Sequence, residues 1–165
     1  AERYLVSKTK KGEFNNHELY QQIINRLLCV YKNEIACWSL DKLEELFLEA
    51  EFQAEKESLS VNREQANLLM RFQGSVAVVS DFYMDSFFLN RLFVHFGIAD
   101  YINKIYVSCE YKENKYCGTL YKVVLKDLCI MPEEAEMYGD NIHADVKMAK
   151  QCGISAHLVK TEKIL

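Results

Sequence analysis

The fold class is indicated most clearly by the run Ser75-Val-Ala-Val-Val-Ser80, which Asp81 follows directly. It is a short, continuous series of mostly β-branched apolar residues between turn-forming residues. Such a run is typical of a strand that is buried on both faces of a parallel sheet. Further strands are predicted at residues 105–108, 135–138 and 155–159. Because helical segments separate these strands, the sequence predicts βαβ units and a doubly wound parallel α/β sheet.

The segments around these strands carry helix signals. Asn62 and Asp85 each stand where an N-cap is expected, directly before a stretch with helical spacing of apolar residues. Two more helices are predicted over residues 120–128 and 144–152, and Gly153 is a suitable end for the second of them. Helix and strand therefore alternate through the last hundred residues.

The first 60 residues show helical periodicity without a strand signal. Apolar residues over positions 20–31 form one stripe, with Asn15 or Asn16 as the predicted N-cap. A second helix is predicted to begin at Asp41, whose third following residue is the glutamate of a capping box. The sequence thus predicts a helical segment over residues 1–60 and an α/β domain over residues 61–165.

Composition excludes several classes of function. The 165 residues carry 20 basic and 24 acidic side chains, a net charge of -4, which argues against binding nucleic acid through a basic face. No apolar run approaches the roughly 20 residues that span a bilayer, so no membrane span is expected. The six cysteines contain no CxxC pair, and we interpret them as reduced, buried thiols of a cytoplasmic protein. The sequence does not indicate which oligomeric state the protein forms.

Polar residues cluster where strands of the predicted sheet end, and ligands of doubly wound sheets bind beyond the carboxyl ends of the strands. The candidate site residues are Ser80, Asp81, Lys115, Asp140, Asn141 and Asp145. A hydroxyl, an ammonium group and carboxylates at one sheet edge suit an anionic substrate beside a divalent cation. The hydroxyl and the lysine would contact phosphate oxygens, and the carboxylates would bind Mg²⁺.

Each candidate also has a purely structural interpretation. Ser80 and Asp81 belong to residue types that commonly end strands and cap helices. Lys115 lies in a highly charged stretch, where a lysine is usually solvated and contributes little to stability. Asp140 and Asp145 suit a turn and the first turn of a helix. The order of the whole set, rather than any single residue, favours a functional site.

Three segments in that order resemble motifs II, III and IV of the haloacid-dehalogenase-like (HAD) hydrolase superfamily. They are the stretch over residues 76–84, the stretch over residues 107–110 together with Lys115, and Met137-Tyr-Gly-Asp-Asn-Ile-His-Ala-Asp145. The GDxxxxD segment, which lies between a predicted strand and a predicted helix, is the most specific of them. The segments SDFYM at residues 80–84 and GDNIHADVKMAKQCGI at residues 139–154 also resemble a branch of predicted hydrolases that are linked to polysaccharide glycosyltransferases. A covalent or non-covalent link to such an enzyme is therefore expected.

The resemblance implies an Mg²⁺-dependent phosphohydrolase of a small phosphorylated metabolite, such as a sugar phosphate. Ser80 would hydrogen-bond the transferring phosphoryl group, and Lys115 would offset its negative charge. Asp140 would ligate Mg²⁺, with Asp145 as a further ligand, while Asp81 and Asn141 would contact the substrate. The helical N-terminal segment would be a cap that excludes water and selects the leaving group.

One element of the family pattern is missing from the sequence. The nucleophile of the family lies in a DxDx[TV] motif on the central strand, between the strands that carry motifs II and IV, and no aspartate precedes Asp41. Omitting a central strand would leave unpaired backbone groups. We therefore expect this strand to belong to an N-terminal portion beyond residues 1–165.

Two functions remain open at this point. The first is the phosphohydrolase, for which Lys115→Ala is expected to lower turnover with little effect on the fold, because a solvated lysine contributes little to stability. The second is a non-catalytic HAD-like binding or scaffolding domain that is associated with a polysaccharide-synthesis enzyme. A receiver-like phospho-acceptor domain is disfavoured by the helical first third and by the GDxxxxD segment.

Overall fold

The computed structural model describes residues 16–31 and 38–160 of the chain. It separates a helical part, residues 15–60, from a second unit that includes the chain from Val61 onward. In the first unit, residues 16–31 and 38–60 contain helices and no strand, and the second unit contains all the strands that the structure describes. Asn15, one of the two predicted N-caps of the first helix, lies outside the described residues.

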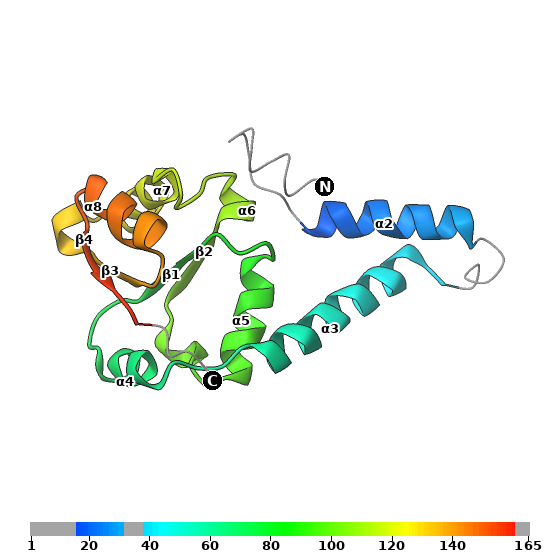
Figure 1. Ribbon diagram of the computed structural model, residues 1–165, viewed down its shortest axis with the longest axis horizontal. Helices are drawn as coiled ribbons and strands as arrows, with labels where there is room; N and C mark the ends of the chain where they lie inside the picture. Colours follow the sequence, from blue (N-terminus) through cyan, green and yellow to red (C-terminus); the bar gives the residue numbers. More distant parts are fainter. Residues whose placement is uncertain (1–15, 32–37, 161–165) are drawn as a thin grey trace. The chain divides into compact units, whose positions relative to one another are not determined.

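The helical unit consists of α2 (Asn16–Val30) and α3 (Leu40–Ser58), shown in blue and cyan in Figure 1. The rings of Tyr20 and Phe47 stack between the two helices with their centroids 5.6 Å apart. Ile24, one turn after Tyr20, is 1% exposed. Tyr20 and Ile24 of the predicted stripe are therefore buried on α2, whereas Tyr31 at its end is 49% exposed.

The start of α3 differs from the prediction. Ser39, not Asp41, is the N-cap, and its hydroxyl accepts a hydrogen bond from the backbone N–H of Lys42 at 3.2 Å. Asp41 instead lies in the first turn, where a carboxylate interacts favourably with the helix dipole. Serine and aspartate both suit this end of a helix, so the local sequence alone did not decide between them.

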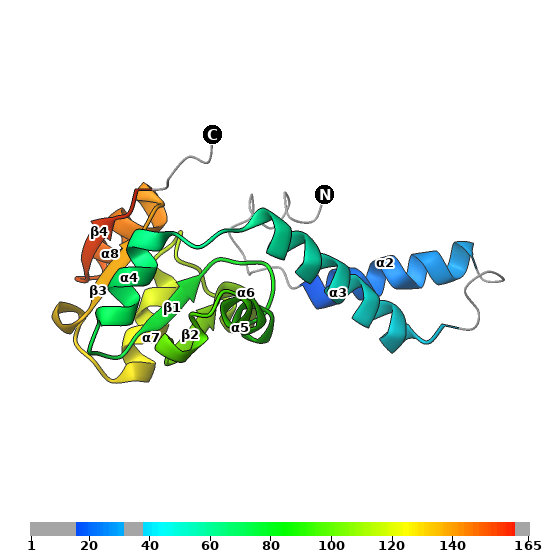
Figure 2. The same ribbon diagram turned by 90° about the horizontal axis from the view of Figure 1, so that it is seen from below.

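The second unit alternates strands with helices (Figures 1 and 2). In chain order, its elements are α4 (Arg63–Arg71), β1 (Ala77–Ser80), α5 (Ser86–His95), η1 (Ala99–Tyr101), β2 (Lys104–Val107), α6 (Ser108–Tyr111), α7 (Thr119–Leu128), η2 (Pro132–Glu134), β3 (Glu136–Gly139), η3 (Ile142–Lys147), α8 (Met148–Gln151) and β4 (Ser155–Leu158). The predicted caps are confirmed, because Asn62 accepts from the N–H of Gln65 and Asp85 accepts from that of Phe88. None of the described helices is long and apolar enough to cross a membrane.

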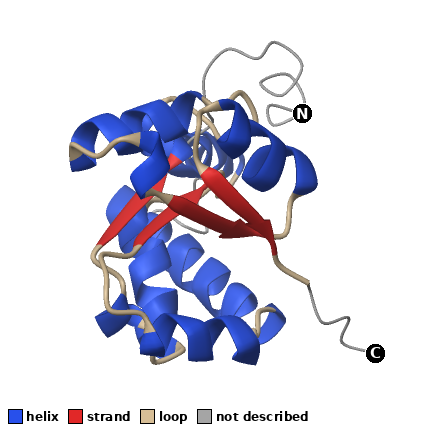
Figure 3. Cartoon of the chain, turned by 90° about the vertical axis from the view of Figure 1, so that its left-hand side faces the viewer, coloured by secondary structure: helices blue, strands red, loops and turns tan. Residues whose placement is uncertain are grey.

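The strands are parallel, as predicted, and helices lie on both sides of the strand layer (Figure 3). They form two separate pairs rather than one continuous sheet, with β1 beside β2 and β3 beside β4. The fold is thus the predicted mixed α/β type. Within the described chain, β1 and β3 each have a strand neighbour on one edge only.

Helix α7 links the two pairs through its buried face. Leu120 packs with Tyr106 of β2, and the next residue, Tyr121, packs with Ile154 just before β4. Val79 of β1 packs against both clusters. The core of this unit therefore runs beneath α7 from one strand pair to the other.

Strand β1 is less buried than the sequence predicts. All four of its residues are half-buried, although the apolar run was expected to be covered on both faces. Strand β3 alternates between exposed and half-buried residues, and Tyr138 is 44% exposed. A strand in the middle of a doubly wound sheet is covered on both edges and both faces. Strand β2 also has a strand neighbour on one edge only within the described chain, yet its Tyr106 and Val107 are 0% exposed, so an open edge alone does not set the burial of a strand in this fold.

The cysteines are only partly as predicted. The five that the structure describes are all free, which agrees with reduced thiols. Only Cys109 is buried, however, and Cys29, Cys117 and Cys129 are exposed. The prediction of buried thiols was wrong for those three, and Cys37 lies outside the described residues.

Candidate active site

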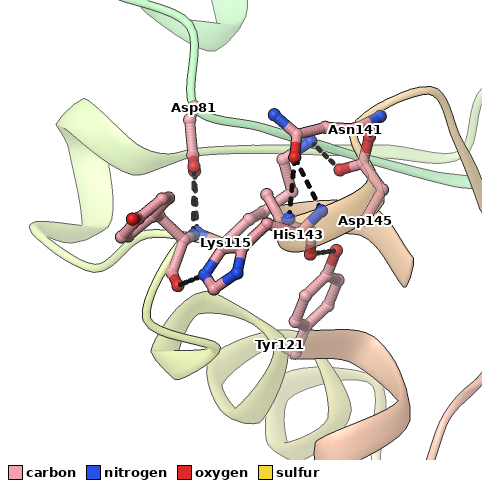
Figure 4. A network of polar contacts seen from close by, with 8 residues as sticks. Asp81, Lys115, Tyr121, Asn141, His143 and Asp145 are labelled. Carbon is pink, nitrogen blue, oxygen red and sulfur yellow. Dashed lines mark hydrogen bonds and ion pairs between the residues drawn. The ribbon is translucent and has the colours of Figure 1, made fainter. Parts of the chain in front are cut away.

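The candidate residues follow the carboxyl ends of β1 and β3 or contact residues there, and Figure 4 shows four of them, Asp81, Lys115, Asn141 and Asp145. Ser80 is the last residue of β1, and Asp140 comes directly after β3. Lys115 lies in the loop between α6 and α7, and Asp145 lies in η3. Residues that are 60 positions apart in sequence, Ser80 and Asp140, thus stand at the carboxyl ends of two parallel-paired strands.

A buried ion pair occupies the centre of this region. The Lys115 Nζ lies 2.6 Å from Asp145 Oδ1, and the two side chains are only 13% and 4% exposed. The other carboxylate oxygen of Asp145 accepts a hydrogen bond from the backbone N–H of Asn141 at 3.0 Å. A buried carboxylate requires such partners, because an unpaired charge is costly away from water.

This ion pair corrects the expectation for Lys115. The sequence suggested a solvated loop lysine whose removal would scarcely affect the fold. The structure instead buries most of its side chain against Asp145. Sequence composition missed this because the partner lies 30 residues away in η3.

Gly139 lets Asp145 reach the end of β3. A Cβ atom at position 139 would lie 2.3 Å from Asp145 Oδ2 and 2.5 Å from its Cγ. Such distances are far inside van der Waals contact, so any larger residue would push the carboxylate away. The glycine of the GDxxxxD segment is thus a packing requirement of the ion pair.

The turn that holds Asp145 is stabilised locally. Asn141 caps η3, a π-helical turn, and its side-chain oxygen accepts from the N–H groups of His143 and Ala144 at 3.0 and 2.9 Å. The buried Tyr121 hydroxyl donates to the Ala144 carbonyl at 2.9 Å, and burial raises the pKa of this phenol far above its ordinary value. π-Helical turns occur often at functional sites.

Asp81 contacts the loop that carries Lys115. Its Oδ1 accepts from the backbone N–H of Lys115 at 2.8 Å, and its Oδ2 accepts from that of Tyr116 at 3.2 Å. The carbonyl of Tyr116 lies 3.1 Å from His143 Nε2, and the two rings have centroids 4.4 Å apart. Sequence reasoning missed Tyr116 and His143, because no spacing signal connects residues from different loops.

Ser80 and Asp140 are placed at the same edge but make no side-chain hydrogen bond or ion pair within the described residues. Ser80 is half-buried opposite Val107 in the β1–β2 pair, and Asp140 is exposed. Lys115 therefore contacts both other charged residues, with its backbone N–H on Asp81 and its ammonium group on Asp145. The Ser80 hydroxyl and the Asp140 carboxylate remain available to bind a ligand.

Of the three candidate carboxylates, Asp81 and Asp145 already use both oxygens in contacts within the described part of the protein, and Asp140 does not. Among residues 16–31 and 38–160, no group of three or more His, Cys, Asp or Glu side chains is arranged to hold a metal ion. Magnesium commonly binds through one or two protein carboxylates, with waters and substrate phosphates as its other ligands. Asp140 is available for this role, whereas both oxygens of Asp145 already have partners.

The sequence profile of haloacid dehalogenase-like hydrolases matches residues 69–159, more than half of the 165-residue chain. The match includes all the candidate residues at the ends of β1 and β3. The chain therefore belongs to the haloacid dehalogenase-like hydrolase family. No curated protein sequence matches it.

Solved structures share this fold. The chain is similar to a 2-haloacid dehalogenase from Pseudomonas syringae pv. tomato DC3000 at 17% identity and a TM-score of 0.64, over 99% of this chain and 70% of that one. It is similar to an uncharacterized protein from Listeria monocytogenes serotype 4b at 25% identity and a TM-score of 0.53, over 65% and 67% of the two chains. A HAD family enzyme from Bacteroides thetaiotaomicron, in complex with magnesium and inorganic phosphate, matches at 21% identity and a TM-score of 0.54, over 86% and 80%.

Proposed function

We propose that this protein is a cytoplasmic, Mg²⁺-dependent phosphohydrolase that acts on a small phosphorylated metabolite, such as a sugar phosphate. The observation that carries the proposal is the buried Lys115–Asp145 ion pair at the carboxyl ends of parallel strands. A lysine that is held in place there offers a fixed positive charge where ligands of such folds bind. Membership of a hydrolase family supports the same reaction class.

The proposed chemistry follows from what phosphoryl transfer requires. Catalysis of this reaction depends mostly on positioned positive charge around the phosphoryl oxygens. Lys115 would supply part of that charge, and the Ser80 hydroxyl would donate to a phosphoryl oxygen. Asp140 would hold Mg²⁺, which would neutralise further negative charge when bound. The magnesium and phosphate in the Bacteroides neighbour support this choice of ions.

The nucleophile would be an aspartate on a strand that pairs with β1 and β3. Support comes from the open edges of these two strands. Support also comes from the sequence, in which no aspartate precedes Asp41 and no DxDx[TV] motif occurs. In this proposal the added strand completes the sheet between the two observed pairs, and residues 1–60 act as the cap.

A second candidate function is a non-catalytic HAD-like domain that binds or scaffolds a polysaccharide-synthesis enzyme, through a link to a glycosyltransferase. The absence of the nucleophile motif from the sequence favours it. The buried Lys115–Asp145 pair favours the enzyme, because a scaffold does not require a charged pair at this edge.

Hydrolysis of phosphate monoesters by the natural protein that contains residues 1–165 tests the proposal. An aryl phosphate and a panel of sugar phosphates are incubated with Mg²⁺ and with EDTA, and released phosphate is measured. We expect release that depends on Mg²⁺. Failure to release phosphate from any of these compounds, or equal release in EDTA, would overturn the phosphohydrolase proposal and leave the scaffold.

A further inference from the structure

The loop that carries Lys115 is held to the rest of the fold by two other residues. It spans positions 112–118, between the single turn of α6 and the start of α7. Asn114 joins this loop to itself and to α7. Its side-chain oxygen accepts from the N–H of Cys117 within the loop, and its backbone carbonyl accepts from the N–H of Leu120 in α7. The N–H groups of Lys115 and Tyr116 are not used in this way, and both donate to Asp81 instead.

Asp81 uses both carboxylate oxygens for this contact. Each oxygen accepts one of two successive backbone N–H groups, at 2.8 and 3.2 Å, from residues 34 and 35 positions away in sequence. Hydrogen bonds to an ionised acceptor are stronger than those between neutral groups. A carboxylate also repels a phosphate group, so these bonds suit a residue that positions the loop better than one that binds the substrate.

His143 contacts the next peptide unit of the same loop. In the tautomer with its proton on Nε2, it donates to the Tyr116 carbonyl at 3.1 Å, and its ring lies against the Tyr116 ring. His143 belongs to η3, which also contains Asp145. The backbone beside Lys115 and the side chain of Lys115 are therefore attached to the same turn (Figure 4).

We infer that Asp81 and His143 are positioning residues that fix loop 112–118, so that the Lys115 ammonium stays on Asp145 at the carboxyl ends of β1 and β3. The role in catalysis rests on the proposed function, whereas the positioning itself does not. A lysine side chain has four rotatable bonds, and anchoring its backbone removes much of the freedom that would otherwise separate it from Asp145.

Two measurements on the protein test this inference without any assay of activity. The first is amide hydrogen exchange by NMR, and the second is the rate at which Lys115 is acetylated by acetic anhydride, measured by mass spectrometry. For Asp81→Ala we expect at least tenfold faster exchange at Lys115 and Tyr116, and at least threefold faster acetylation of Lys115. The exposed Lys122 provides the internal reference for acetylation.

Conservative variants separate positioning from general damage to the fold. Asp81→Asn retains one acceptor oxygen, so exchange should increase at one of the two amides and less at the other. His143→Gln retains an N–H donor and should stay closer to wild type than His143→Ala. Asp100→Ala, at an exposed position in η1, is the matched control and should change neither readout.

The outcomes decide the inference separately from the proposed function. Unchanged exchange at Lys115 and Tyr116 in Asp81→Ala and Asp81→Asn would overturn it. So would faster exchange with an unchanged rate of acetylation of Lys115, because the loop would then not position the ammonium group. If both readouts change as expected but the wild-type protein hydrolyses no phosphate monoester, the positioning holds and only the proposed function fails.

Discussion

Removal of the Lys115 ammonium should destabilise the α/β unit, in contrast to the expectation for a solvated lysine. In Lys115→Met, a side chain of similar length without charge would leave the Asp145 carboxylate buried, with the N–H of Asn141 as its remaining partner. Breaking a buried ion pair in this way costs about 3–5 kcal/mol. Because the Lys115 side chain is 13% exposed, we expect the free energy of unfolding to fall by an amount near the lower limit, about 3 kcal/mol.

A double-mutant cycle tests whether the loss comes from the pair. In Lys115→Met/Asp145→Asn no charge remains stranded, and the asparagine oxygen can still accept from Asn141. We expect this double variant to be more stable than Lys115→Met alone, with a coupling energy of at least about 2 kcal/mol. The free energy of unfolding is measured by urea titration with circular dichroism.

The exposed Lys122 of α7 supplies the control, and Lys122→Met should stay within about 0.5 kcal/mol of wild type. If Lys115→Met also stays within that range, or if the effects of the two substitutions simply add, the ion pair does not stabilise the protein and the reasoning is refuted.

Three further outcomes follow from local geometry. Gly139→Ala should lower the free energy of unfolding by about 1–3 kcal/mol, because its Cβ would collide with Asp145; a stability equal to wild type in a urea titration would contradict the packing requirement. Burial raises the pKa of the Cys109 thiol to about 11, so at pH 8 iodoacetamide should modify it at least tenfold more slowly than the exposed Cys117, as measured by mass spectrometry; equal rates would contradict its burial. Burial also raises the pKa of Tyr106 to about 12, so the folded state favours the neutral phenol, and this contribution is present below pH 10 and is lost as the pH rises toward 12. Stability should therefore fall more steeply over that pH interval in wild type than in Tyr106→Phe, and parallel curves would contradict this.

Much of the fold could be predicted from local sequence. The apolar runs of the strands and the caps at Asn62 and Asp85 act over a few residues, and local pattern recovers such features. From the predicted ends of the strands, Ser80 and Asp140 could be assigned to the same edge of a parallel sheet before any tertiary contact was known. The N-cap at Ser39 was missed because two capping residues stand close together.

The contacts that build the site could not be predicted in the same way. Asp81 bonds to backbone groups 34 and 35 residues away, and His143 meets Tyr116 across 27 residues. Such pairs depend on how loops meet in space, and side-chain periodicity carries no information about them. The separation of the strands into two pairs agrees with the expected gap between the strands of motifs II and IV, whereas the half-burial of β1 was not predicted, since its apolar run is typical of a fully covered strand.

The central claim is that Asp140, at the end of β3, belongs to a site that hydrolyses phosphate monoesters with Mg²⁺. The most direct test compares phosphate release by the natural protein with that of its Asp140→Asn and Asp100→Asn variants, at saturating Mg²⁺. Asp140→Asn removes the available carboxylate at the site, whereas Asp100→Asn changes an exposed aspartate in η1. The account predicts at least a hundredfold loss of kcat/KM for Asp140→Asn, about 2.7 kcal/mol of transition-state stabilisation, and none for Asp100→Asn. Equal activity in all three proteins would contradict it.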